Sequence, residues 1–116
     1  MSTPEGIVKN AICSWLSTQV CFFFIHDSVG VFDPVRKRFR VNNSPYRVRG
    51  VADILGIWNG KPLAIEVKSE KGKLSEHQKL FLLRWQQAGG IAIVARSIDE
   101  VRVNLKQTGG RDESSV

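Results

Sequence analysis

The chain has 116 residues, of which 42% are hydrophobic and 24% are charged, and it carries a formal net charge of +6 at pH 7. This length suits one domain with one hydrophobic core, and this composition excludes a disordered chain. The positive charge favours an anionic partner, because binding to a polyphosphate releases counterions. Cys13 and Cys21 are too few for a disulfide framework or a zinc knuckle, so we expect both to be reduced and buried.

No stretch of the sequence is apolar over a length that would span a bilayer, so we expect no membrane segment. The first residues lack the basic, apolar and small-residue regions of a signal peptide. We therefore expect a cytoplasmic protein that is not secreted from the cell that makes it.

The pattern of apolar residues predicts alternating helices and strands. Thr3-Pro4 is typical of a helix start, with Thr3 as N-cap and Pro4 in the first turn. We then expect an extended aromatic stretch over 20–33 with one break at 28–30, strands over 52–58 and 61–67, a helix over 75–88, a strand over 91–95 and a short helix over 97–105. This order predicts an α/β fold with helices on a central mixed sheet. Residues 1–106 would form the domain, and residues 107–116 a flexible polar tail.

Much of the positive charge lies in one segment before the predicted strand pair. Its basic residues are Arg36, Lys37, Arg38, Arg40, Arg47 and Arg49. Such a run is often an ordinary solvated hairpin, but the interleaved Phe39 and Tyr46 favour contact with the phosphates of DNA. Arginine suits that role because its guanidinium group binds phosphate through two hydrogen bonds.

The dipeptide Asn59-Gly60 between two apolar runs predicts a tight hairpin, because both central positions of a type I′ turn need a positive φ. A two-residue loop fixes the register: Trp58 opposes Lys61, and counting back places Asp53 opposite Glu66. Directly opposed like charges destabilise a sheet unless something compensates them. We expect a divalent cation between the two carboxylates.

Two further groups would face this cation. Lys68 lies two residues beyond Glu66 and therefore on the same face of the strand, while Val67 points into the core and leaves its carbonyl to the site. Oxygen ligands with room for water and phosphate suit Mg²⁺, with Mn²⁺ as a substitute, and do not suit zinc. The remaining hairpin residues are apolar on both faces, so we expect a central strand pair covered on both sides. The alternative is a surface salt bridge of Lys68 at a frayed strand end.

With these residues in place, the sequence resembles the VRR-NUC family, the virus-type replication-repair nucleases of the PD-(D/E)xK superfamily. The resemblance runs from Glu5 to about Val101, and it rests on Gly50-Val51-Ala52-Asp53, Glu66-Val67-Lys68 and Ser75-Glu76-His77-Gln78. It includes Leu74-Ser75 with Gln78-Lys79 and the segment from Gly89-Gly90 to Ala95-Arg96-Ser97. It implies a restriction-endonuclease-like αβββαβ core and a metal-dependent endonuclease. Stand-alone viral members are similar to Holliday-junction resolvases and act as homodimers, so the resemblance also implies branched DNA as substrate.

The resemblance also implies a role for individual residues. Asp53 and Glu66 would ligate the metal, Lys68 would position or activate water, and Gln78 and Glu5 would support them. Ala52 is a departure, because the family usually has proline before the aspartate.

Some of these residues have a purely structural alternative. Gln78 also completes a capping box with Ser75, and Glu5 also complements the dipole of the first helix. His26 and His77 lack the neighbours of a metal site, so we expect no site role for either. Phe22-Phe23-Phe24, or the first helix around Trp15, would supply a dimer interface or merely fill the core.

Two functions compete with a nuclease that cuts branched DNA. A non-catalytic DNA-binding module would keep the fold and the basic face, but the intact Asp53, Glu66 and Lys68 argue against it. A nuclease acting on flap, single-stranded or RNA substrates would use the same residues, and the sequence alone leaves this alternative open.

Overall fold

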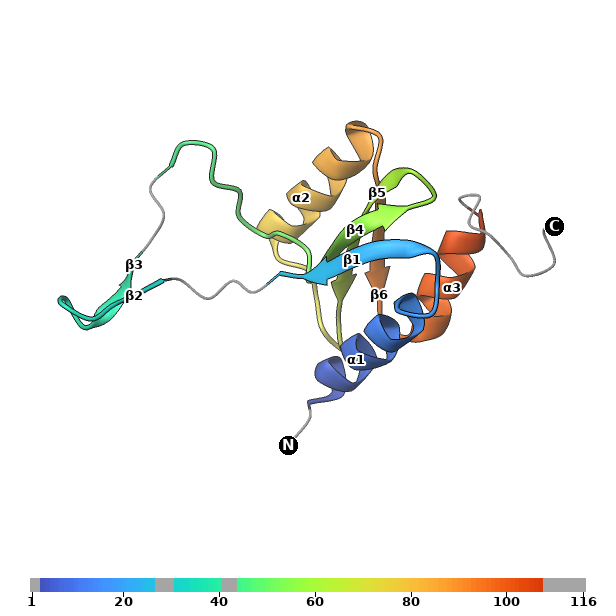
Figure 1. Ribbon diagram of the computed structural model, residues 1–116, viewed down its shortest axis with the longest axis horizontal. Coiled ribbons are helices and arrows are strands. Elements are labelled where there is room, and N and C mark those ends of the chain that lie inside the picture. The colour runs from blue at the N-terminus through green and yellow to red at the C-terminus, as the bar shows by residue number, and fades with distance from the viewer. Residues whose placement is uncertain (1–2, 27–30, 41–43, 108–116) are drawn as a thin grey trace.

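The computed structural model describes residues 3–26, 31–40 and 44–107 (Figure 1). Its main sheet has the strand order β1-β4-β5-β6, and β2 and β3 form a separate two-stranded sheet. The elements are α1 (Pro4–Leu16), β1 (Cys21–Ile25), β2 (Val31–Asp33), β3 (Arg38–Arg40), β4 (Ile54–Trp58), β5 (Lys61–Val67), α2 (Glu76–Gln87), β6 (Ile91–Ala95) and α3 (Ile98–Gln107). The predicted break at 28–30 and all but the first residue of the predicted tail lie outside the described residues.

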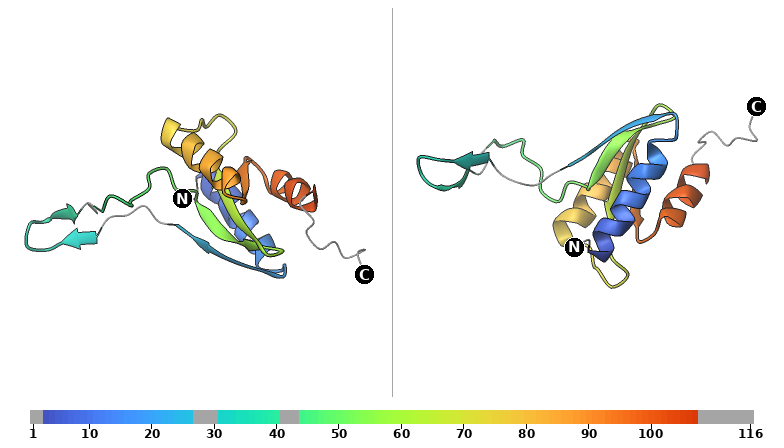
Figure 2. Two further views of the ribbon diagram at one scale, coloured as in Figure 1. Left: turned by 90° about the horizontal axis from the view of Figure 1, so that it is seen from above. Right: turned by 60° about the horizontal axis from the view of Figure 1, so that its bottom comes forward.

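The main sheet is mixed, as the sequence predicts. β1 pairs with β4 and β4 with β5 in antiparallel fashion, whereas β6 lies parallel to β5 after the crossover through α2. Helices α1 and α3 lie on one face of this sheet and α2 on the other (Figure 2). This arrangement is the α/β fold with flanking helices expected of a restriction-endonuclease-like core.

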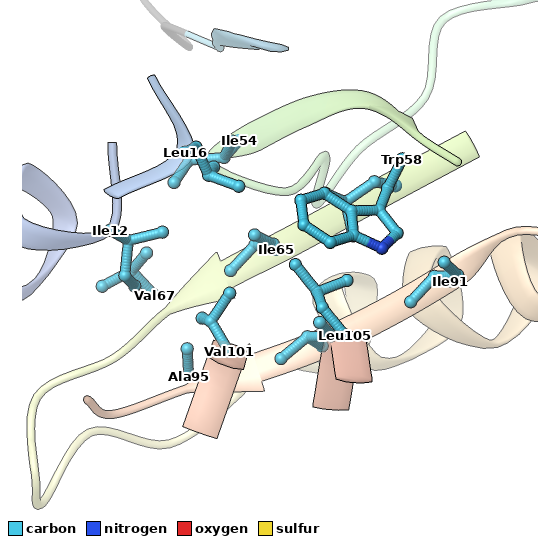
Figure 3. Packing of buried hydrophobic residues seen from close by; sticks show 12 residues of the cluster. Ile12, Leu16, Ile54, Trp58, Ile65, Val67, Ile91, Ala95, Val101 and Leu105 are labelled. Carbon is cyan, nitrogen blue, oxygen red and sulfur yellow. The ribbon is translucent and has the colours of Figure 1, made fainter. Parts of the chain in front are cut away.

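The larger core lies between the sheet and the helices α1 and α3 (Figure 3). Its fully buried members include Ile12 and Leu16 from α1, Ile65 from β5, and Val101 and Leu105 from α3. Each helix contributes apolar residues at the spacing of a helical turn, so one stripe of each faces the sheet. This core holds β4 and β5 in a fixed register, and thereby fixes the positions of Asp53, just before β4, and Glu66 on β5.

The helix start at Thr3 and the tight turn at Asn59-Gly60 form as the local sequence predicts. The Thr3 hydroxyl accepts a hydrogen bond from the Gly6 N–H at the start of α1. Asn59 and Gly60 have φ values of 50° and 79°, as a type I′ turn requires. The observed register pairs Trp58 with Lys61 and continues to Ile54 with Ile65. The predicted hairpin register is therefore confirmed along β4.

Three predicted elements need correction. The extended stretch over 20–33 is two strands, β1 and β2, that belong to different sheets. The strand expected from residue 52 begins at Ile54, and the last helix covers Ile98–Gln107 and not 97–105. Runs of β-forming residues do not reveal which sheet a strand joins, because this depends on partners distant in the sequence.

The expectation that the strand pair is covered on both sides is wrong for β4. Helix α2 packs through Leu82 on Ala64 and through its partly buried aromatic residues on neighbouring apolar residues of the sheet. Ile57 on the same face is 52% exposed. The single helix on this face is too narrow for four strands, so no described helix covers β1 or the Ile57 end of β4.

Both cysteine thiols are free and half-buried, and burial raises the pKa of each thiol. Trp58 is buried and stacks against Trp15, with 5.8 Å between the ring centroids.

In the described part of the chain, none of the helices has both the length and the apolar character needed to cross a bilayer.

Candidate active site

Asp53 directly precedes β4 and is held by both neighbouring strands. Its carbonyl accepts a hydrogen bond of 2.8 Å from the backbone N–H of His26, the residue after β1. Its side-chain Oδ2 accepts a hydrogen bond of 2.9 Å from the N–H of Val67 on β5. These two bonds fix both the backbone and the carboxylate of Asp53 at the end of the sheet.

Glu66 is the one charged residue in the buried set of the described chain, with 3% of its surface exposed. Burial, and after it the negative charge of Asp53, raises the pKa of Glu66 from 4.5 to about 7, although Lys68 opposes both effects. A carboxylate in such surroundings is costly unless a positive charge joins it. Asp53 and Glu66 therefore lie next to each other at this end of the hairpin, as the predicted register requires.

Lys68 is the first residue after β5, and its side chain lies beside Glu66. Its Nζ lies 3.7 Å from Glu66 Oε1, and its side chain is only 15% exposed. The Lys68 N–H donates to the carbonyl of Ala95 on β6, so the parallel pairing of β5 and β6 continues into the site. This ion pair joins a buried glutamate to a lysine that is largely shielded from solvent and held by β6, so it differs from the frayed surface bridge considered as the alternative.

Gln78 caps α2 and also contacts Glu66. Its Oε1 accepts a hydrogen bond from the Ser75 N–H, and the Ser75 hydroxyl accepts one from the Gln78 N–H, which completes the capping box of α2. Its Nε2 donates to Glu66 Oε1 at 2.9 Å. Because the cap engages the amide oxygen, the amide nitrogen must face Glu66, and the start of α2 thereby orients the buried carboxylate.

The loop after Lys68 is held by Arg96, the first residue after β6. One guanidinium nitrogen, Nη1, donates to the carbonyls of Ser69 at 2.6 Å and Gly72 at 2.7 Å. The Gly72 N–H closes a turn onto the Ser69 carbonyl, and a Cβ placed on Gly72 would lie 3.4 Å from Lys68 Cδ. The turn over 69–72 therefore packs beside the aliphatic part of Lys68.

The donor groups at this site fit a hard divalent cation. Glu66 Oε1 accepts from Gln78, whereas Glu66 Oε2 is buried beside Asp53 and has no hydrogen-bond partner among the described residues. Among the described residues, no cluster of three or more metal-ligating side chains occurs. Two carboxylates leave several coordination positions to backbone, water and substrate oxygens, which is how Mg²⁺ is usually bound.

For Glu5 and for the Val67 carbonyl, the described contacts show no part in the site. Glu5 is half-buried in the first turn of α1 and does not complete a three-residue cluster with Asp53 and Glu66 within the described chain. The Val67 side chain is buried as expected, and the use of its carbonyl as a ligand stays a prediction.

The predicted basic segment is divided between two structures. Four exposed residues lie in the turn of the β2–β3 hairpin and in the loop before Gly50: Arg36, Lys37, Arg47 and Arg49. Arg38 and Arg40 lie on β3, and their side chains are outside the described part.

Three residues to which the sequence interpretation gives no site role help to build the site. His26 holds Asp53 through its backbone, and Arg96 holds the loop after Lys68. Gly50 has a φ of 73°, and a Cβ on it would lie 2.4 Å from the carbonyl carbon of His77. Only glycine allows the end of the basic loop to lie directly against the first turn of α2. The family resemblance includes Gly50 in a motif, but only the three-dimensional contacts show what it does.

Comparison with known proteins shows the family to which the chain belongs. The model of the VRR-NUC domain matches residues 35–99, a range that contains Asp53, Glu66, Lys68, Gln78 and Arg96. Neither the curated proteins nor the solved structures yield a significant match. The matched range covers more than half of the chain and includes β4 and β5. The chain therefore belongs to the VRR-NUC domain family and carries a nuclease-type domain.

Proposed function

We propose that this protein is a Mg²⁺-dependent endonuclease that hydrolyses phosphodiester bonds of DNA, with Mn²⁺ as a substitute metal. One observation carries the proposal. Glu66 is buried beside Asp53, and one of its carboxylate oxygens has no hydrogen-bond partner within the described chain, at the end of a strand pair in a VRR-NUC domain. An unpartnered buried anionic oxygen is unfavourable in the free protein and favourable as a ligand.

Asp53 and Glu66 would hold the cation, together with the carbonyl of Val67. The hydrogen bond from the Val67 N–H fixes Oδ2 of Asp53, and the Gln78 amide fixes Oε1 of Glu66. One oxygen of each carboxylate is thus restrained by a hydrogen bond, and the other oxygen would bind the cation. When bound, the cation supplies positive charge to a phosphodiester oxygen and lowers the pKa of a coordinated water.

Lys68 would act on the reacting phosphate or on the attacking water. Its ammonium group lies within 4 Å of the buried carboxylate and is largely shielded from solvent. In such surroundings a fixed positive charge stabilises developing negative charge more strongly than it does in water. Lys68 would therefore stabilise the transition state or orient the water, while Asp53 and Glu66 hold the metal.

We propose branched DNA of the Holliday-junction type as the substrate and a homodimer as the active form. The support is the family resemblance and the need for two nicks in a junction with two-fold symmetry. One domain of 13.0 kDa has one such site, and a two-fold dimer supplies the second. Light scattering with and without junction DNA measures this, and a single-chain mass in both conditions would contradict the dimer.

A cleavage assay tests the activity itself. Wild-type protein, Asp53→Asn and Glu66→Gln are incubated with labelled junction, duplex, flap, single-stranded and RNA substrates in Mg²⁺, Mn²⁺ or EDTA. We expect cutting by the wild type only with metal, none by either variant, and unimpaired DNA binding by both, because losing a negative charge eases the approach of phosphate.

The matched control for these variants is Glu76→Gln, an acid that is 89% exposed and paired only with Lys79 among its described contacts. This variant should cut like the wild type. Full activity in EDTA, or native cleavage by Asp53→Asn, would refute the proposed metal site. Binding by all proteins without any cleavage by the wild type would instead favour a non-catalytic DNA-binding module.

A further inference from the structure

The face of the sheet that carries the acidic pair also carries an exposed aromatic surface. Phe22 is 66% exposed and Phe24 is 49% exposed, although both lie on a strand of the main sheet. Phe23 between them packs into the core on the opposite face. Strand residues alternate between faces, so Phe22 and Phe24 point the same way, to the face opposite α1 and α3, beside the part of that face that α2 covers.

The strand register shows which face this is. Phe24 pairs with Leu55 and Phe22 with Ile57, and Leu55 belongs to the cluster beneath α2. Glu66 points to the α2 face as well, because it bonds to Gln78. Paired residues of antiparallel strands share a face. The phenylalanines therefore lie on the same side of the sheet as the acidic pair.

The aromatic surface leads directly to the candidate active site. β1 ends beside Asp53, since the N–H of the next residue, His26, donates to the Asp53 carbonyl. At about 3.3 Å per residue, Phe24 lies roughly 7 Å and Phe22 roughly 13 Å along the strand from that point. A nucleic-acid strand entering the site over β1 would pass both rings within a few nucleotides.

We propose that Phe22 and Phe24 form a stacking platform for unpaired nucleobases next to the active site. The two ring centroids are 6.1 Å apart and the rings are tilted by 46°, so they do not stack face to face on each other. Exposed aromatic rings on a sheet are the usual surface on which proteins stack single-stranded bases. A duplex keeps its bases stacked inside and would gain little from such rings.

The charge of the protein favours a nucleic acid over a second protein chain on this surface. The chain has a net charge of +6, and the exposed Arg47 and Arg49 lie in the loop that meets the start of α2 on the same face. A strand across the site would thus meet arginines on one flank and aromatic rings on the other. This inference rests on the proposed nuclease function and narrows the proposed branched substrates to those that expose unpaired bases at the cut, such as a junction opened at its branch point or a flap. A dimer would then use another surface, such as the exposed side of α1.

The test compares two double variants with the wild type. Phe22→Ala with Phe24→Ala removes the rings, while Phe22→Leu with Phe24→Leu keeps apolar bulk but no aromatic face. The control is Val103→Ala on α3, a residue that is 55% exposed on the other side of the sheet. Binding to fluorescein-labelled oligothymidylate and to a duplex of equal length is measured in EDTA, where no cleavage occurs, and thermal unfolding checks that each variant is folded.

We expect each ring that is removed to weaken oligothymidylate binding by about fivefold or more, in the alanine and leucine variants alike, and duplex binding to stay unchanged. Equal losses for both nucleic acids would overturn the platform. It would also be overturned if the alanine variant became monomeric from a dimeric wild type while the leucine variant behaved normally, because that outcome assigns the surface to a second copy.

The two hypotheses fail in different ways. If the wild type cuts nothing in Mg²⁺ but the phenylalanine variants lose oligothymidylate binding, the proposed nuclease function fails and the platform stands. If cleavage is metal-dependent and the variants bind oligothymidylate like the wild type, the platform fails and the nuclease function stands.

Discussion

Replacing Glu66 by glutamine should stabilise the metal-free protein at alkaline pH and leave its stability unchanged at acid pH. Burial, and then the charge of Asp53, raises the pKa of Glu66 from 4.5 to about 7 in the folded protein. The folded state therefore binds this proton more tightly than the unfolded state does. The stability that the proton contributes is fully present below pH 4.5 and is lost as the pH rises through about 7. Glutamine stays neutral throughout.

The size of the effect follows from the same two values. One pKa unit corresponds to about 1.4 kcal/mol, so a rise from 4.5 to about 7 corresponds to about 3 kcal/mol. Glu66 is only 3% exposed, so solvent screening does not reduce this value much. At roughly 4 °C per kcal/mol for a domain of this size, Tm of Glu66→Gln should exceed that of the wild type by on the order of 10 °C at pH 8.

The assay is thermal unfolding of wild type, Glu66→Gln and the exposed control Glu76→Gln in EDTA between pH 4 and pH 8. The gap between Glu66→Gln and wild type should be near zero at pH 4, should widen between pH 4.5 and about 7, and should level off at higher pH. Mg²⁺ at pH 8 should raise Tm of the wild type and not of Glu66→Gln, because the ion binds the carboxylate. A gap of the same size at every pH would refute the argument, since it would show that shape and not charge distinguishes the two side chains.

Two further substitutions test the surroundings of the site. Replacing Arg47 and Arg49 by alanine should lower the slope of log affinity against log salt by about 0.9 for each phosphate that the protein no longer neutralises, and an unchanged slope would place the DNA surface elsewhere. Gly50→Ala should reduce cleavage more than Gly60→Ala, since both glycines have similar φ values of 73° and 79° but only a Cβ at Gly50 meets backbone, including the Gln78 nitrogen at 2.6 Å. Cleavage rates and Tm of the two variants give the comparison, and equal losses would show that φ strain alone matters.

The features that could be predicted from the sequence are those that short segments determine. Asn59-Gly60 fixes the hairpin register, because only residues that tolerate positive φ form its turn, and the register then brings Asp53 and Glu66 together. The Ser75–Gln78 capping box is equally local. The two alternative roles that local signals indicate for Gln78 are compatible, because the two ends of one amide bind two different partners.

The features that could not be predicted depend on which elements meet in three dimensions. Alternation along β1 separates Phe23 from its neighbours, but it does not say that α2 is too narrow to cover Phe22 and Phe24. Arg96 gives no local signal, since its acceptors at Ser69 and Gly72 are carbonyls more than twenty residues away. Backbone carbonyls are present at every residue, so the sequence does not mark which ones a half-buried arginine will reach.

Arg96 is a positioning residue for Lys68 if the turn over 69–72 is what holds the lysine in place. Arg96→Ala leaves two carbonyls without their charged donor, so the turn should loosen and cleavage should fall by about 10- to 100-fold, as a displacement near 1 Å can cause. Arg96→Lys should recover little, because Nη1 reaches both carbonyls from a planar group that lysine lacks. The control is Arg102→Ala, whose guanidinium is half-exposed and pairs with the exposed Asp99 at 3.9 Å.

A double-mutant cycle with Lys68→Ala separates positioning from general stabilisation. If Arg96 acts through Lys68, its replacement should cost little further activity once Lys68 is gone, although each single variant is strongly impaired. The loss of Tm, by contrast, should be similar in both backgrounds, because the carbonyl contacts do not involve the ammonium group. Equal fold losses of cleavage with and without Lys68 would contradict the positioning role, and they would indicate that Arg96 supports the fold of the loop without directing the lysine to the reacting phosphate.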